Sequence, residues 1–132
     1  MSNTFVIKGF GGERKLHGTV RVTGAKNSAL KAIASTVLFS DTVTLTNIPE
    51  INDTLRMFEL LRDMGAEVSN TKKGVYTVAI KKGFATELSP GIAKKMRASI
   101  VATGPVLARY GKVSFPHPGG CIIGARPVDL FI

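Results

Sequence analysis

The sequence predicts an α/β fold in which helices cover a mixed β-sheet. Segments with alternating polar and apolar residues take turns with segments whose apolar residues recur at helical spacing. Their order is strand, helix, strand, helix, strand, strand, and the pattern begins again after residues 81–83. We therefore expect one complete βαβαββ unit followed by part of a second.

The first half of the predicted unit is a strand, a helix and a second strand. Residues 18–23 alternate and contain β-branched side chains, which is typical of a strand. Asn27 or Ser28 can cap a helix over roughly 28–39, whose nearly continuous apolar surface predicts deep burial. Residues 42–48 alternate again and predict the second strand.

The second half of the unit is a helix and a hairpin. Asn52 or Asp53 can cap a helix that ends just before Gly65, a natural C-terminal stop. Residues 66–70 and 74–80 predict the two strands of a hairpin. The apolar residues expected on the inner face of the helix are Leu55, Phe58, Leu61 and Met64.

The second unit begins with a helix opened by Ser89-Pro90, in the order of cap and proline that favours a helix start. We expect this helix to continue past Arg97 to residue 101. A kink or restart is expected at Gly104-Pro105, because an interior proline costs about 3 kcal/mol. Residues 112–115 predict a short strand.

The charge of the chain points to an anionic partner. Lysine and arginine number 18 against nine acidic residues, a formal net charge of +9. Residues 14–40 hold five bases and residues 88–128 hold six, and neither stretch contains an acid. A solvated basic surface is the alternative. A nucleic-acid-binding module would also fit the charge, but aromatic residues make up only 7% and no nucleic-acid motif is present, so no such partner is expected.

Four residues at three places in the chain are candidates for anion binding. Lys26 and Asn27 lie at the predicted turn from a strand into a helix, where free backbone N–H groups attract anions. The alternative there is an ordinary cap beside a solvated lysine. Arg97 is expected on one helix face with Lys94, as an anion contact or as part of an exposed basic surface. Arg126 can bind a phosphate or a carboxylate with its planar guanidinium.

Cys121 is the only cysteine and lies in a glycine-rich stretch. Nearby positive charge favours a reactive thiolate, whereas most free cysteines are buried and inert, and both interpretations stay open. One cysteine forms no internal disulfide, and His17 and His117 make no metal pattern, so we expect a cytoplasmic protein without a metal. No apolar run approaches the ~18 residues of a membrane span, so no membrane partner is expected.

Three motifs together resemble the UDP-N-acetylglucosamine enolpyruvyl transferase family. The motifs are Gly24-Ala25-Lys26-Asn27, Lys95-Met96-Arg97-Ala98-Ser99-Ile100 and the run from Pro118 to Leu130. The resemblance implies an inside-out α/β barrel that needs no metal or organic cofactor. It also implies transfer of the enolpyruvyl group of phosphoenolpyruvate to the 3-hydroxyl of UDP-N-acetylglucosamine, the first committed step of peptidoglycan synthesis. The shikimate-pathway enolpyruvyl transferases share this fold, but the cysteine loop is not expected in them.

The resemblance assigns roles to individual residues. Lys26 and Asn27 match residues that contact phosphoenolpyruvate, and Arg97 matches an arginine that helps to bind substrate. Cys121 matches a loop cysteine that donates a proton, forms an adduct with the enolpyruvyl substrate and is alkylated by fosfomycin. The residues that match a run holding the uridine nucleotide are Arg126, Pro127, Val128, Asp129 and Leu130.

Family members are much longer than this chain. The resemblance therefore implies that residues 1–132 are a single partial domain, the N-terminal portion of a two-domain enzyme. Residues 1–20 would be an N-terminal strand or crossover segment. A later aspartate base and further arginines are missing, so we expect the chain alone to be inactive. Open sheet edges of a half-built repeat also predict self-association.

Overall fold

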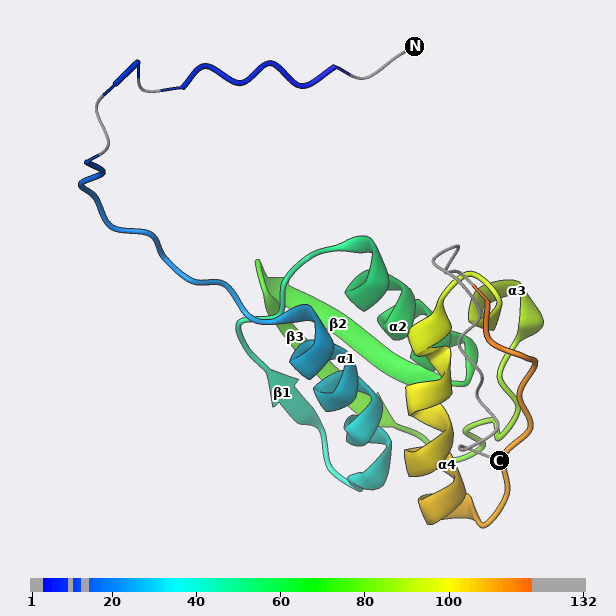
Figure 1. Cartoon of the computed structure of the whole chain (residues 1–132). Coiled ribbons are helices and arrows are strands. Elements are labelled where there is room, and N and C mark those ends of the chain that lie inside the picture. The colour runs from blue at the N-terminus through cyan, green and yellow to red at the C-terminus, as the bar shows by residue number, and fades with distance from the viewer. Residues whose placement is uncertain (1–3, 10, 13–14, 120–132) are drawn as a thin grey trace.

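The computed structural model describes residues 4–9, 11–12 and 15–119, and they fall into two parts (Figure 1). An exposed N-terminal segment leads away from a folded core that begins near residue 25. The core is a small sheet covered on one face by helices, as Figure 1 shows. The α/β class predicted from the sequence is confirmed.

The sheet has three strands in the order β1-β3-β2, with β1 at Val43–Leu45, β2 at Ala66–Lys72 and β3 at Val75–Ile80. The predicted hairpin is confirmed as β2 and β3. Both pairings are antiparallel, so the expectation of a mixed sheet is wrong for the described residues. The strand expected at 112–115 is reduced to one parallel bridge, between Glu87 and Ser114.

Helices account for most of the remaining core. The α-helices are α1 (Lys26–Ser35), α2 (Asn52–Asp63), α3 (Pro90–Ala93) and α4 (Thr103–Tyr110), and the 3₁₀ helices are η1 (Thr36–Leu38) and η2 (Arg97–Ala102). Helices α1 and α2 lie over the sheet, and α4 lies beside them (Figure 1). Gly65 follows α2 with a φ of 102°, the left-handed conformation predicted for a C-terminal stop.

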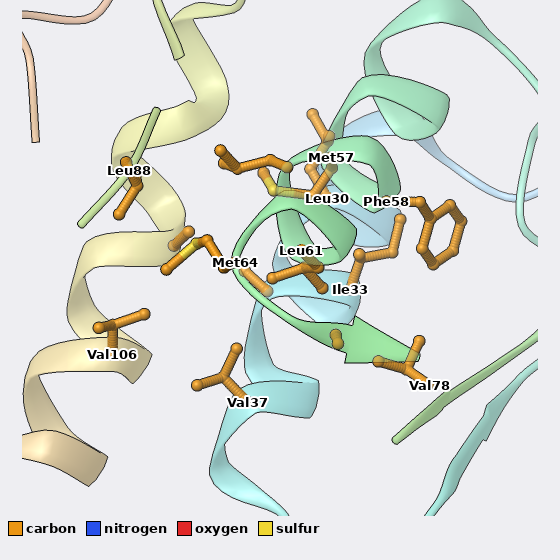
Figure 2. Close-up of a cluster of buried hydrophobic side chains, with 14 of the residues drawn as sticks. Leu30, Ile33, Val37, Met57, Phe58, Leu61, Met64, Val78, Leu88 and Val106 are labelled. Atoms are coloured by element: carbon orange, nitrogen blue, oxygen red, sulfur yellow. The ribbon is translucent and has the colours of Figure 1, made fainter. Parts of the chain in front are cut away.

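The hydrophobic core lies between this helical layer and one face of the sheet (Figure 2). Tyr76, Val78 and Ile80 alternate along β3 and are all buried. The ring of Phe58 from α2 stacks on Tyr76 with centroids 4.2 Å apart. Each large apolar side chain buried here contributes about 1.5–3 kcal/mol relative to exposure. Other fully buried members are Ile33, Val37, Met57, Leu61, Met64, Leu88 and Val106.

Residues 18–23 do not form the strand that their alternation predicts. Val20 and Val22 are 89% and 85% exposed. A strand needs a neighbour to receive its backbone hydrogen bonds. Within the described residues, β1 and β2 occupy both sides of β3, and no strand pairs with 18–23. The alternating pattern is therefore present without the partner that would make it a strand.

Helix α1 begins two residues earlier than expected. Its N-cap is Ala25, so neither Asn27 nor Ser28 caps it, and both lie within its first turn. Gly24 permits this start, because a side chain there would run into the backbone carbonyl of Asn47. The burial predicted for this segment holds for the apolar residues up to Val37 except the partly buried Ala32, but not for Leu38 and Phe39, which are half exposed. Leu38 is the last residue of η1, and Phe39 follows it.

The inner face of α2 differs from the prediction at one position. Leu55 is 43% exposed, whereas the adjacent residue Thr54 is buried. The Thr54 hydroxyl accepts a hydrogen bond from the N–H of Ile51 at 3.3 Å and lies within bonding distance of the Pro49 carbonyl. A buried hydroxyl is tolerated when it is bonded in this way. Thr54 therefore anchors the start of α2, where neither Asn52 nor Asp53 is the cap.

The helix expected from residue 89 to residue 101 is interrupted at Lys94–Met96, which lies before the predicted break. Met96 has an extended backbone, with φ −142° and ψ 118°, and its side chain is buried in the core. Pro105 lies in the first turn of α4, where a missing N–H removes no intrahelical bond. The expectation that Lys94 and Arg97 share one helix face is therefore wrong, because the helix is interrupted between them.

Candidate functional site: a cationic pocket

A pocket of about 390 Å³ lies where the start of α1, the first turns of α2 and the turn into η2 meet. Three residues predicted from the sequence line this one pocket: the neighbours Lys26 and Asn27, and Arg97, which is far from them in the chain. The other lining residues are Leu30, Asp53, Arg56, Lys95, Met96, Ala98 and Ile100. Four cationic side chains and one carboxylate give the lining a formal charge of 4 − 1 = +3. A small polyanion with an apolar portion matches this mixture.

Lys26 enters the pocket from the first residue of α1. Its Nζ lies 3.0 Å from Oδ2 of Asp53, with both side chains partly exposed. Within the described residues, no side chain caps the N-terminus of α1. The first-turn N–H groups of a helix have no intrahelical acceptor and carry partial positive charge. Lys26 therefore adds a full charge to a helix end that already favours anions.

Helix α2 supplies Asp53 and Arg56, which are three residues apart and so share a face. The Nη1 group of Arg56 donates a hydrogen bond to the carbonyl oxygen of Lys95 at 3.0 Å. No function was expected for Arg56, and Asp53 was expected only as a possible helix cap. Their i,i+3 spacing, directly after a loop that follows a strand, is the signal that would have indicated a shared role.

The loop before α2 is fastened to the hairpin by Glu50. Its Oε1 accepts hydrogen bonds from the Gly74 N–H at 3.0 Å, the Tyr76 hydroxyl at 3.2 Å and Asn70 Nδ2 at 3.3 Å. The bond from the Gly74 N–H is the main reason that the pKa of Glu50 lies below its usual value. Burial raises the pKa of Tyr76, and the nearby Glu50 carboxylate adds to that rise. This network fixes where α2 begins and hence where Asp53 and Arg56 point.

The remaining site residues predicted from the sequence lie outside the described part of the chain. They are Cys121, Arg126, Pro127, Val128, Asp129 and Leu130. Among the described residues, no group of three or more histidine, cysteine, aspartate or glutamate side chains could hold a metal ion. The helices in that same part of the chain are all too short or too polar to cross a membrane.

A match to a known family model identifies the family of the chain. The family model described as EPSP synthase (3-phosphoshikimate 1-carboxyvinyltransferase) matches residues 11–132. The chain belongs to the EPSP synthase family. The match begins before the cationic pocket and covers every residue that lines it, so the pocket lies in the part of the chain that the family shares.

Curated relatives of the chain are named UDP-N-acetylglucosamine 1-carboxyvinyltransferase, in agreement with the motif resemblance. The protein from a strain of Coxiella burnetii is 43% identical over 117 residues, and that from Wolinella succinogenes is 43% identical over 122. The protein from a Nitratiruptor species is 40% identical over 121 residues. These matches cover 89–92% of this chain but only 27–29% of each relative. The chain thus spans less than a third of their length.

A solved structure supports the fold of this EPSP synthase family member. The crystal structure of the enolpyruvyl transferase NikO from Streptomyces tendae superposes with a TM-score of 0.63 and 27% sequence identity. The superposition covers 76% of this chain and 23% of NikO. The prediction that the chain forms part of the enolpyruvyl transferase fold is confirmed.

Proposed function

We propose that this chain is the N-terminal portion of a UDP-N-acetylglucosamine 1-carboxyvinyltransferase. The observation that carries the proposal is the meeting of Lys26, Asn27 and Arg97 in one cationic pocket. The names of the curated relatives support the same activity. The proposed substrates are phosphoenolpyruvate and UDP-N-acetylglucosamine, with no metal, organic cofactor, nucleic acid or membrane partner.

In the proposed reaction, the pocket binds the phosphate and carboxylate of phosphoenolpyruvate. Lys26 and the N-terminus of α1 meet one anionic group, Asn27 donates an amide hydrogen bond, and Arg97 contributes a second cation. Apolar residues such as Leu30 and Ile100 lie against the three-carbon unit. Cations held in place before the reaction stabilise negative charge in the transition state without reorganising.

The proposed chemical role of Cys121 is that of a general acid. Transfer of the thiol proton to the methylene carbon of phosphoenolpyruvate leaves an oxocarbenium-like centre at the adjacent carbon. The sugar 3-hydroxyl adds to that centre and loses its proton to a base supplied by the rest of the enzyme. Loss of a methyl proton and of phosphate from the tetrahedral intermediate then restores the carbon–carbon double bond. Alkylation of the same thiol by fosfomycin follows from its nucleophilic thiolate form.

The remaining elements of the proposal concern the whole enzyme. The run from Arg126 to Leu130 would hold the uridine nucleotide, and residues 1–20 would form a strand or crossover segment of the two-domain protein. The activity would serve cell-wall peptidoglycan synthesis in the cytoplasm. The 132-residue chain alone would not turn over substrate, because a closed two-domain cleft needs the second domain. It would self-associate, since β1 and β2 each have one unpaired edge within the described residues.

Mass spectrometry of the chain after fosfomycin treatment tests the function. We expect a single adduct on Cys121 whose yield rises when UDP-N-acetylglucosamine is present. The matched control is Cys121→Asp, which removes the nucleophile and should carry no adduct. An adduct yield that ignores the nucleotide sugar, or no adduct on the unsubstituted chain, would contradict the proposal.

The shikimate-pathway reaction is the second candidate, because the matching family model is described as 3-phosphoshikimate 1-carboxyvinyltransferase. The same alkylation experiment separates the two candidates. If 3-phosphoshikimate raised the adduct yield and UDP-N-acetylglucosamine did not, the acceptor substrate would be reassigned.

A further inference from the structure

The turn at Lys94–Met96 carries two lining residues of the pocket's wall, Lys95 and Met96, and leads directly into Arg97. This turn breaks what the sequence predicts as a continuous helix, so its carbonyl groups are not all used by regular helical bonds. Its geometry therefore depends on contacts from other parts of the chain. Besides the burial of the Met96 side chain in the core, two contacts to the backbone of the turn are seen, and they come from separate elements.

The first contact comes from α2. Arg56 Nη1 donates to the Lys95 carbonyl at 3.0 Å, across 39 positions of sequence. A charged guanidinium donor makes a stronger hydrogen bond than a neutral donor, so it restrains the position of the Lys95 carbonyl oxygen. The bond thereby tethers the Lys95–Met96 peptide, which directly precedes Arg97, to α2.

The second contact comes from the segment that follows Phe115. Gly119 packs so closely on Lys94 that an added Cβ would overlap the Lys94 carbonyl oxygen and press on its Cα. These are backbone atoms, which cannot rotate away as a flexible side chain would. Only glycine fits at position 119 while the Lys94 carbonyl stays in place. Cys121 follows Gly119 by two residues in the sequence.

We propose that Arg56 and Gly119 are positioning residues that together hold the Lys94–Met96 turn. They thereby place Lys95 and Arg97 where both can bind an anion. The inference rests on the proposed function, which makes this pocket the site of phosphoenolpyruvate. Neither residue needs to touch the substrate: Arg56 acts through the Lys95 carbonyl and Gly119 acts through the Lys94 carbonyl. The turn is thus a shared support for the pocket wall and for the start of the cysteine-bearing segment.

Arg56 also lines the pocket, so its own charge could attract an anion directly. Gly119 separates the two explanations, because Gly119→Ala changes no charge. Gly104→Ala is the matched control, since a Cβ at Gly104 meets no atom within 4 Å. Arg56→Met removes both charge and donor, whereas Arg56→Lys keeps a charged donor that can reach a carbonyl.

The first arm of the test uses ligand-free protein. Amide chemical shifts and hydrogen exchange of residues 94–97 are measured by NMR in the unsubstituted chain and the four variants. Gly119→Ala and Arg56→Met should shift these amides and speed their exchange about tenfold, as expected for loss of roughly one hydrogen bond's worth of local stability. Gly104→Ala should leave them unchanged. Unmoved amides in both Gly119→Ala and Arg56→Met would overturn the inference, whatever the protein binds.

The second arm titrates phosphoenolpyruvate, with inorganic phosphate as a simpler anion. We expect Gly119→Ala to weaken phosphoenolpyruvate binding about fivefold and Arg56→Met at least about tenfold, with Arg56→Lys recovering most of the loss. Gly104→Ala should bind like the unsubstituted chain. A displaced turn with unchanged affinity would overturn the positioning role. Failure of the unsubstituted chain to bind either anion would instead overturn the proposed function, and the positioning role with it.

Discussion

Residues 18–23 and β3 at Val75–Ile80 carry the same kind of alternating, β-branched sequence, yet only β3 is a strand. In β3, Val78 is 1% exposed and has a paired strand on each side. In the N-terminal segment, Val20 is 89% exposed and no described strand lies beside it. Alternation therefore reports that a segment suits a sheet, and the presence of hydrogen-bonding neighbours decides whether it joins one.

The largest difference between the two segments is expected when the same charged residue is placed in each of them. Val78→Asp buries a carboxylate in the core without a partner, and should destabilise the fold by about 4 kcal/mol or more. Val20→Asp should change the free energy of unfolding by less than about 0.5 kcal/mol, because the site is already solvated. Urea unfolding of the two variants measures the difference. Comparable losses would mean that residues 18–23 are packed in solution after all.

A smaller effect is expected from the hydroxyl that ties β3 to the loop before α2. Tyr76→Phe keeps the ring stacked on Phe58 but removes the hydrogen bond to Glu50. The free energy of unfolding should fall by about 0.5–1.5 kcal/mol. Tyr110→Phe is the control, because its ring also stacks, on Phe84, while no hydrogen bond of its hydroxyl is found within the described residues. Equal effects of the two substitutions would show that the hydroxyl bond contributes nothing.

The smallest effect concerns pH. Because the folded state lowers the pKa of Glu50 below its ordinary value of 4.5, the ionised carboxylate favours folding. Its contribution is complete above the unfolded pKa and is lost as pH falls through the lower, folded value. Urea midpoints measured downward from neutral pH should decline in this acid range, and Glu50→Gln should show a shallower decline. A variant curve parallel to that of the unsubstituted chain would show that other carboxylates control the acid response.

Much of the fold could be predicted from local sequence signals. The hairpin, the C-terminal stop at Gly65 and the burial of α1 follow from turn residues and apolar periodicity. The break at Lys94–Met96 could not be predicted, because it depends on burying Met96 in a core built from distant elements. The proline at 105, which looked disruptive, falls in a first helical turn where it is harmless.

The pocket could be predicted in part. Lys26, Asn27 and Arg97 carried signals of their own, a helix start and a basic run. Asp53 and Arg56 did not, because their importance arises from what they contact: Lys26 in one case and the Lys95 carbonyl in the other. Gly119 belongs to the motif from Pro118 to Leu130, but nothing in that motif indicated its close contact with Lys94. Contacts between residues that are distant in the chain cannot be predicted from a single sequence.

The ion pair between Lys26 and Asp53 has a consequence for ligand selection. Without a ligand, the Lys26 ammonium already lies 3.0 Å from the Asp53 carboxylate. A monoanion that replaced this carboxylate would therefore add little electrostatic attraction. A guest with two or three negative charges can engage Lys26 and the neighbouring cations at once, and its attraction grows with each added charge. We therefore expect chloride or acetate to bind this pocket weakly, because each would only replace the Asp53 carboxylate beside Lys26. A phosphorylated acid should bind more tightly, because its several charges can attract more than one of the four cations that line the pocket.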